Sequence, residues 1–377
     1  MSQGQNPIPK PKLPVVQFTS NWGGLSFGPI EALMKDPSVT EIMVNGPRRV
    51  FIETQGTLKS TPIVFTSEDE LLKLFHQIAK YLGKSLDEQN LTLDGRLPDG
   101  SRVNLVIPPI AVDGPSLTIR KFSPYSLSHE QLLNAGMLDE RMAYFLNCCV
   151  NARINMVISG GTGSGKTTLL NMLSSFIDIH ERVVSIEDTA ELKLQLPNLV
   201  RLEARPGNLR DVAPVTIRHL VINALRMRPD RIIIGECRGA EAIDMLFAMN
   251  TGHDGSMTTI HSNTARDAIR RVEAMVMLAG SELPLRTIRE YVSSAIQLIV
   301  NVQRDRDGKR RIVEMIEVCG MEGEVILTQE IFKFNALENR FTCPGFVPRF
   351  IQKFNARGIQ FPPDFFSDKY KITRKAS

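Results

Sequence analysis

The chain has 377 residues, of which 42% are hydrophobic and 23% are charged. This balance is typical of folded globular proteins and unlike that of disordered or collagen-like chains, and the length predicts two domains or three. No apolar run approaches the roughly 18 to 20 residues that cross a bilayer, and the first residues lack the apolar stretch of a secretory signal. The sequence therefore predicts a cytoplasmic protein with no transmembrane segment.

The cysteines and the net charge exclude little. The five cysteines form no CxxC pair that could hold zinc, and Cys148 and Cys149 are adjacent, which is a poor arrangement for a disulfide. They are expected to be reduced thiols. The net charge of +4 is spread along the chain, so it permits contact with a membrane surface or nucleic acid without requiring either.

The first third of the chain predicts a small α+β domain over residues 25–122, after a flexible segment over residues 1–24. Extended segments are expected at residues 41–44, 50–53, 102–108 and 117–122. Asn45-Gly46-Pro47 is a strong signal for a hairpin turn. The capping-box pattern at residues 67–70, followed by apolar residues at helical spacing, predicts a helix. A linker with one small helix is expected over residues 123–137.

Further along the chain, apolar strands alternate with helices and glycine-rich turns, which is typical of βαβ units and a mostly parallel sheet. The candidate core strands are residues 155–159, 183–187, 200–203, 231–235 and 257–260. A turn at residues 305–308 separates strands at residues 311–318 and 324–334, which suggest a small β appendage. These elements predict an α/β domain over residues 138–345 and a C-terminal tail over residues 346–377.

One segment carries the clearest chemistry. It reads Gly160-Gly161-Thr162-Gly163-Ser164-Gly165-Lys166-Thr167-Thr168 and matches the phosphate-loop pattern G-x-x-x-x-G-K-[ST]. An apolar strand precedes it and a helix-compatible run follows, which argues against a chance match. Backbone N–H groups of such a loop point at phosphate oxygens, and the helix N-terminus adds its positive dipole end. Lys166 is expected to neutralise the β- and γ-phosphates and Thr167 to bind Mg²⁺, so the segment predicts an ATP site.

Two acids follow predicted strands downstream of this loop. Glu187 ends one strand, and Glu236 follows another after Gly235. Gly235 stands where many P-loop enzymes have the aspartate that binds Mg²⁺, so Glu236 acts without that neighbour, which favours a contribution from Glu187. Glu236 is expected to hold the metal, partly through water, and both acids are catalytic candidates. The pattern leaves open which of Glu187 and Glu236 activates water, and the alternative for each is a solvated loop acid.

Two of the six histidines, His253 and His261, flank one short predicted strand, each beside small polar residues or glycine. A single histidine is more often structural than catalytic. Two at one strand favour a role in sensing the γ-phosphate.

These residues resemble the secretion ATPases of type II and type IV systems, and most closely the CpaF-like ATPases of Tad/Flp pilus machines. The matching stretches are residues 160–171, 184–194 (Asp box), 225–236 (atypical Walker B), 248–263 (His box), 40–46 and 95–104. The resemblance covers about residues 25–335. The absence of a tetracysteine insert favours the CpaF-like and VirB-type branches, and residues 205–213 depart from the family's glycine-rich stretch.

The resemblance implies a homohexameric ring in which an N-terminal domain and a RecA-like ATPase domain enclose the nucleotide. Arg96, Arg102 and Arg120 would then reach the phosphates from the N-terminal domain or a neighbouring subunit. ATP-driven motion would pass to inner-membrane platform proteins of a pilus or secretion machine, which implies a peripheral location at the inner membrane.

Three alternatives remain. The first is a VirB-type ATPase that exports protein or DNA. The second is a nucleic-acid-translocating RecA-like motor, against which stand the aromatic content of 6% and the lack of a basic stripe with interleaved aromatics, so no stable nucleic acid is expected. The third is a nucleotide-binding scaffold without turnover, which the full set of candidate catalytic groups disfavours.

Overall fold

The computed structural model describes residues 24–54, 57–122, 127–205, 213–280, 282–305 and 307–370. The chain forms two compact units, Met1–Tyr125 and Ser126–Ser377, and each is described by itself. The predictions for residues 1–23, for the start of the linker at 123–126, for most of the departing stretch at 206–212 and for residues 371–377 lie outside the described residues. No helix of the described ranges is long and apolar enough to cross a membrane.

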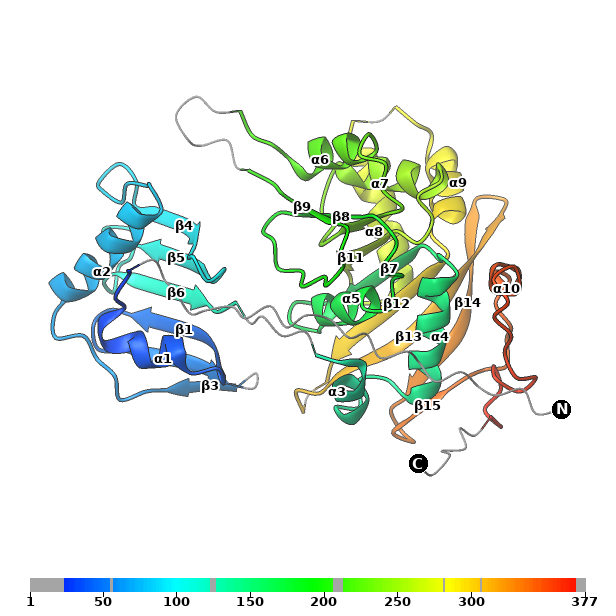
Figure 1. Ribbon diagram of the computed structural model, residues 1–377, viewed down its shortest axis with the longest axis horizontal. Helices are drawn as coiled ribbons and strands as arrows, with labels where there is room; N and C mark the ends of the chain where they lie inside the picture. Colours follow the sequence, from blue (N-terminus) through cyan, green and yellow to red (C-terminus); the bar gives the residue numbers. More distant parts are fainter. Residues whose placement is uncertain are drawn as a thin grey trace. The chain divides into compact units, whose positions relative to one another are not determined.

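The first unit is built on a six-stranded antiparallel sheet, drawn in blue to cyan in Figure 1. Its elements are η1 (Gly28–Ile30), α1 (Glu31–Lys35), β1 (Val39–Asn45), β2 (Val50–Thr54), β3 (Thr57–Ser60), α2 (Glu68–Tyr81), β4 (Thr92–Arg96), β5 (Arg102–Val106) and β6 (Ser116–Arg120). The strand order is β3-β2-β1-β6-β5-β4. Leu71, Phe75 and Ile78 of α2 are fully buried in one core with Ile42 and Ile119 of the sheet, so α2 covers one face of the sheet.

Only one of the two hydrogen bonds of the predicted capping box forms at the start of α2. Ser67 is the N-cap, and its side chain accepts a hydrogen bond from Glu70 N at 3.2 Å. The Glu70 carboxylate instead accepts from the backbone N and the hydroxyl of Thr66, at 2.6 and 2.7 Å. Both arrangements satisfy donors at the helix start, so the helix begins where the sequence predicts.

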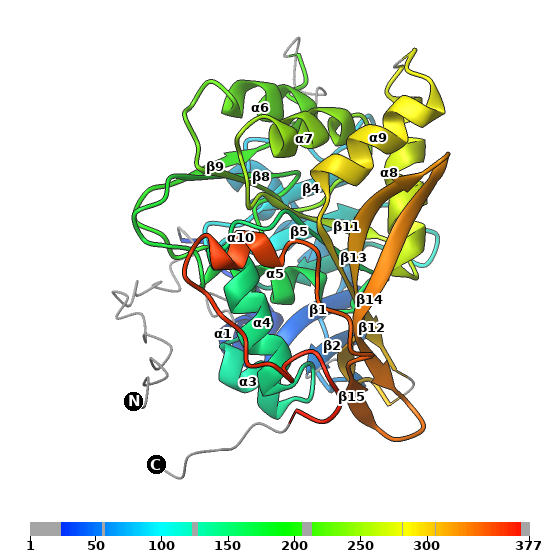
Figure 2. The same cartoon turned by 90° about the vertical axis from the view of Figure 1, so that its right-hand side faces the viewer.

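The second unit is built on a nine-stranded sheet with helices on both faces (Figures 1 and 2). Its helices are α3 (His129–Asn134), α4 (Glu140–Asn151), α5 (Lys166–Ser174), α6 (Ile217–Ala224), α7 (Glu241–Asn250), α8 (Ala265–Leu278), α9 (Leu285–Ala295) and α10 (Ile351–Asn355). Its strands are β7 (Met156–Gly160), β8 (Val183–Glu187), β9 (Leu199–Glu203), β10 (Arg231–Ile234), β11 (Met257–His261), β12 (Leu298–Arg304), β13 (Arg310–Glu322), β14 (Val325–Asn335) and β15 (Arg340–Thr342). The strand order is β15-β14-β13-β12-β7-β11-β10-β8-β9.

The strands from β9 to β12 in this order are parallel, and β13, β14 and β15 continue the sheet in antiparallel fashion. Successive residues of β7 enter different cores: Met156 and Ile158 pack with α4 and α5, and Val157 packs with α6 to α9. The central strands are therefore buried on both faces, which explains their continuous apolar sequences.

The C-terminal part of the sheet corrects one prediction. The strands expected to form a small β appendage are β13 and β14, and they extend the main sheet because β13 pairs with β12 and β12 pairs in parallel with β7. β12 is absent from the predicted strands, although its first five residues are buried.

Residues on both sides of the expected ATPase domain, outside residues 138–345, also pack into its core. Phe350, Phe354 and Phe365, expected in a tail, pack into the same core as Phe145 of α4. Leu132, expected in a linker, is buried in that core as well.

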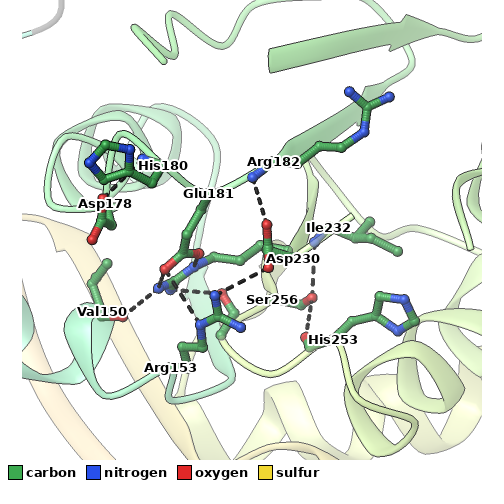
Figure 3. A network of polar contacts seen from close by, with 12 residues as sticks. Val150, Arg153, Asp178, His180, Glu181, Arg182, Asp230, Ile232, His253 and Ser256 are labelled. Atoms are coloured by element: carbon green, nitrogen blue, oxygen red, sulfur yellow. Dashed lines mark hydrogen bonds and ion pairs between the residues drawn. The ribbon is translucent and has the colours of Figure 1, made fainter. Parts of the chain in front are cut away.

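A buried ion-pair network lies where β10 begins (Figure 3). Arg231, the first residue of β10, has no exposed surface and donates from Nη2 to Glu181 Oε1 at 2.9 Å and to Val150 O at 2.8 Å. Arg153 lies 3.4 Å from Glu181 and 3.3 Å from Asp230. This network ties β10 to the end of α4 and to the loop before β8, at the edge of the sheet opposite to the phosphate loop.

Candidate nucleotide site

The phosphate loop lies between the carboxyl end of β7 and the N-terminus of α5. Gly163 and Gly165 have φ of +68° and +103°, a region in which glycine is favoured, and Gly165 is the N-cap of α5. A Cβ on Gly160 would lie 2.3 Å from Val302 O, so the loop leaves β7 against the neighbouring strand β12. Ligands of parallel α/β sheets bind at this edge, and the start of α5 provides the positive end of a helix dipole.

The polar side chains of the loop differ in exposure. Ser164 is buried and its hydroxyl has no hydrogen-bond partner within the described ranges, whereas Thr162 is exposed and Thr167 and Thr168 are half-buried. Lys166 is buried, and its Nζ donates to Gly160 O at 3.0 Å and to Gly161 O at 2.8 Å. Burial lowers the pKa of Lys166, and the carboxylate of Glu236 opposes that shift.

Glu236 and His261 lie beside Lys166. Glu236 Oε1 lies 2.9 Å from His261 Nε2, without the geometry of a hydrogen bond, and the same His261 nitrogen lies 3.4 Å from Lys166 Nζ. Burial opposes ionisation of Glu236, but Arg238, His261 and Lys166 together lower its pKa. Burial and Lys166 lower the pKa of His261, which favours the neutral imidazole, and the Glu236 carboxylate opposes this shift.

Glu187 lies on the strand next to the one that precedes Glu236. Its Oε1 accepts from Glu191 N at 2.7 Å and from Leu192 N at 2.8 Å, and its Oε2 is buried with no hydrogen-bond partner in the part of the chain that the structure describes. Burial raises the pKa of Glu187 to about 6. A Cβ on Gly235 would lie 2.8 Å from Glu187 Cγ, so glycine at this position allows the two strand ends to approach.

The structure does not bring His253 to the phosphate loop, and this corrects the prediction for that residue. His261, at the carboxyl end of β11, pairs with Gly160, but His253 precedes the amino end of the same strand. Its ring Nδ1 lies 3.3 Å from Ala248 O, and its carbonyl accepts from Ser256 Oγ at 2.7 Å, beside the ion-pair network of Figure 3. β11 spans five residues, or about 17 Å, so His261 lies at the edge of the sheet that carries the phosphate loop and His253 lies at the opposite edge.

Arg96, Arg102 and Arg120 belong to the first unit, and they form a row there. In the register of its sheet, Arg102 of β5 lies opposite both Arg96 of β4 and Arg120 of β6. Glu41 of β1 continues the row beside Arg120. Their strand neighbours Val103 and Ile119 are buried, so the arginines lie on the face that α2 does not cover.

Two functional candidates escape the sequence patterns. Arg238 donates to Glu236 at 2.6 Å and lies 3.8 Å from Asp188; its position two residues after Glu236 is the one signal that could have indicated it. Arg310 donates from Nε to Gly163 O at 3.0 Å, across 147 residues of sequence, and no local pattern points to it.

The oxygen atoms that this site offers are suitable ligands for Mg²⁺. Glu236 presents a buried carboxylate oxygen that makes no hydrogen bond in the described ranges, and Thr167 follows the lysine of the loop. Carboxylate and hydroxyl oxygens, together with phosphate oxygens and water, are the ligands that Mg²⁺ prefers. The fold and the site therefore define a P-loop ATPase.

Comparison with known proteins places this ATPase in a family. The family model described as type II/IV secretion system protein matches residues 25–330. The chain therefore belongs to the type II/IV secretion system protein family.

Two relatives and one solved structure show the extent of the similarity. Conjugal transfer protein TrbB of Rhizobium radiobacter is 35% identical over 293 residues, covering 76% of this chain and 86% of that protein. Type IV secretion system protein VirB11 of Bartonella quintana is 34% identical over 324 residues, covering 76% and 90%. The structure of the pilus retraction motor PilT with bound ADP has a TM-score of 0.57 at 20% identity, covering 82% and 84%. This likeness confirms the predicted RecA-like fold with a smaller N-terminal α+β domain.

Proposed function

We propose that this chain is the motor ATPase of a type IV secretion machine, in which ATP hydrolysis by a homohexamer drives export of protein or DNA through inner-membrane partners. The observation that carries the proposal is the cluster of Lys166, Glu236 and His261 at the carboxyl edge of the parallel sheet, directly beside the phosphate loop. The two relatives described above, TrbB and VirB11, bear conjugal transfer and type IV secretion names. Their names favour the VirB-type alternative over the CpaF-like pilus motor that the motifs resemble most closely.

The different environments of the two acids suggest different roles. Glu236 has a lowered pKa and stays ionised, which suits a group that holds Mg²⁺ through its water shell together with Thr167. Glu187 has a pKa raised to about 6 and an oxygen without a hydrogen-bond partner, which suits a group that accepts a proton from the attacking water. Bound Mg²⁺ would supply charge neutralisation between the phosphates. The half-buried His261, 3.4 Å from Lys166, would sense the γ-phosphate.

The arginine row of the first unit would complete the site when the two units, or two subunits, close around ATP. Arginine supplied to a phosphoryl-transfer site from outside can raise its rate by about 10³ to 10⁵. Turnover should therefore depend on assembly of the ring, and the protein is expected to act from the cytoplasmic side of the inner membrane.

ATPase activity measured against particle size tests the proposal. The wild type should form a hexamer with ATP and Mg²⁺ by light scattering, and turnover should rise with the hexamer fraction. Lys166→Ala should lose turnover, and undiminished activity in this variant, or a protein that stays monomeric with ATP, would contradict the proposal.

A deletion strain separates the two export classes. Loss of conjugation or protein export with normal pili supports the type IV assignment, and loss of pili alone supports the CpaF-like alternative.

A further inference from the structure

The turn between β12 and β13 lies at the same edge of the sheet as the phosphate loop. β12 is parallel to β7, and Val302 pairs with Gly160, so β12 ends two residues beyond the point where the loop leaves β7. β13 starts its return at Arg310, which pairs with Arg304. The topology of the sheet, rather than the local sequence, therefore brings Arg310 to the loop.

The side chain of Arg310 lies along the backbone of the loop. Its Nε donates to Gly163 O at 3.0 Å, and its Cδ would lie 3.3 Å from a Cβ on Gly165. Arg311 is directed elsewhere, since its guanidinium lies 3.6 Å from Asp305 and over the ring of Phe334 at 4.5 Å. Of these two adjacent arginines, Arg310 is the one with a hydrogen bond to the loop in the described ranges.

This contact fixes the orientation of one peptide group. The carbonyl of Gly163 and the N–H of Ser164 belong to the same planar unit and point in opposite directions. Ser164 N–H donates to Gly161 O across the loop at 3.4 Å, so its N–H faces the interior of the loop while the carbonyl faces Arg310. Glycine at 163 rotates more freely than other residues, and a flip of this peptide would point a carbonyl oxygen at the phosphates.

We propose that Arg310 is a positioning residue for nucleotide binding, which holds the Gly163–Ser164 peptide with its N–H directed at a phosphate oxygen. The inference rests on the proposed function, in which this loop binds ATP.

A contact that only stabilised the fold would change the unfolding midpoint and not the affinity for nucleotide, and the opposite is expected here. Arg310 is exposed, and an exposed hydrogen bond adds little to the stability of the fold. Its loss should therefore leave the unfolding midpoint unchanged while weakening nucleotide binding. Because the loop contacts ADP and ATP alike, both affinities should fall together, and KM for ATP should change more than kcat.

The test measures dissociation constants for ADP and ATP with Mg²⁺, together with kcat and KM, on the full chain. Arg310→Gln should weaken both affinities about tenfold, since a hydrogen bond from a charged group is lost. Lys309→Gln is the matched control: it removes an equal charge from the adjacent position, and the Lys309 side chain makes no hydrogen bond to the loop in the described ranges. This control should keep wild-type affinity.

Arg310→Lys separates orientation from charge, because lysine keeps the charge and lacks the planar Nε donor. It should stay several-fold weaker than wild type. Full recovery in Arg310→Lys, or equal affinities in Arg310→Gln and Lys309→Gln, would overturn the inference. Failure of the proposed function is distinguishable, since Lys166→Ala would then bind ATP as tightly as the wild type.

Discussion

Glu236 Oε1 lies 2.9 Å from His261 Nε2, and this contact joins the second residue after β10 to the last residue of β11. Lys166 Nζ lies 3.4 Å from the same nitrogen of the imidazole. A carboxylate and a cation thus meet at one ring nitrogen beside the phosphate loop. A change in charge at the loop, such as the arrival of a γ-phosphate, would act directly on this cluster.

Glu236→Gln should lower kcat by about 100-fold or more, because the charge that holds the metal's water shell is lost at the point where transition-state charge develops. ATP affinity should change little, since Lys166 and the loop remain. Steady-state kinetics and ATP titration measure the two effects separately. Glu338→Gln, in the exposed turn before β15, serves as the control. A loss of affinity as large as the loss of kcat would assign Glu236 to binding instead.

Glu187 should give the pH profile of kcat its acidic limb. Since burial raises the pKa of Glu187 to about 6, a proton-accepting role predicts that kcat falls as the pH drops through about 6. Glu187→Gln should lose most activity and also lose this limb. A wild-type profile that is flat from pH 5 to pH 8 would remove Glu187 from the reaction.

The raised pKa of Glu187 also predicts how the stability of the fold depends on pH: stability falls as the pH rises, whereas kcat rises. An acid whose pKa is raised in the folded state, here from 4.5 to about 6, adds stability that is fully present below pH 4.5 and is lost as the pH rises through about 6. At pH 8, Glu187→Gln should therefore unfold with a free energy up to about 2 kcal/mol higher than wild type. Urea titrations at pH 5 and pH 8 measure the difference, which should shrink at the lower pH. Destabilisation at pH 8 would contradict this account.

The parts of the site that depend on local sequence could be predicted, and those that depend on topology could not. Strand, glycine-rich loop and helix follow one another within residues 156–174, so spacing alone locates them. His253 and His261 look equivalent in sequence because both flank β11. In a parallel sheet the two ends of a strand lie at opposite edges, and only the pairing of His261 with Gly160 shows which end faces the loop.

Long-range strand order also explains why the sequence predicted a separate β appendage and did not indicate Arg310. The hairpin of β13 and β14 has the turn and alternation of an independent unit, and nothing in its own residues shows that β12 extends the parallel sheet to meet it. Once this strand is inserted, Arg310 arrives beside Gly163. Long-range strand order thus decided which arginine could reach the loop.

The buried ion pair of Figure 3 should be important for stability. Glu181→Ala would leave Arg231, which has no exposed surface, without its carboxylate partner, and breaking such a pair costs about 3 to 5 kcal/mol. Glu338→Ala removes one of the two carboxylates that pair with Arg340 at the surface, and it should cost much less, because exposed ion pairs add little stability. Urea unfolding of the two variants provides the comparison, and equal stabilities would show that Arg231 finds another partner.

The arginine row should be required for turnover and not for binding. Arg102 lies at the centre of the row, opposite both Arg96 and Arg120, so Arg102→Gln should reduce kcat at saturating ATP by at least about tenfold if the row stabilises transition-state charge. The dissociation constant for ADP should stay near the wild-type value, because the phosphate loop in the second unit is unchanged. Lys59→Gln, an exposed cation on β3 of the same sheet, should have wild-type kcat. Unchanged kcat in an Arg102→Gln variant that still forms the hexamer would show that the row takes no part in hydrolysis. An equal loss of kcat in Arg102→Gln and Lys59→Gln would indicate a general effect of charge on the sheet.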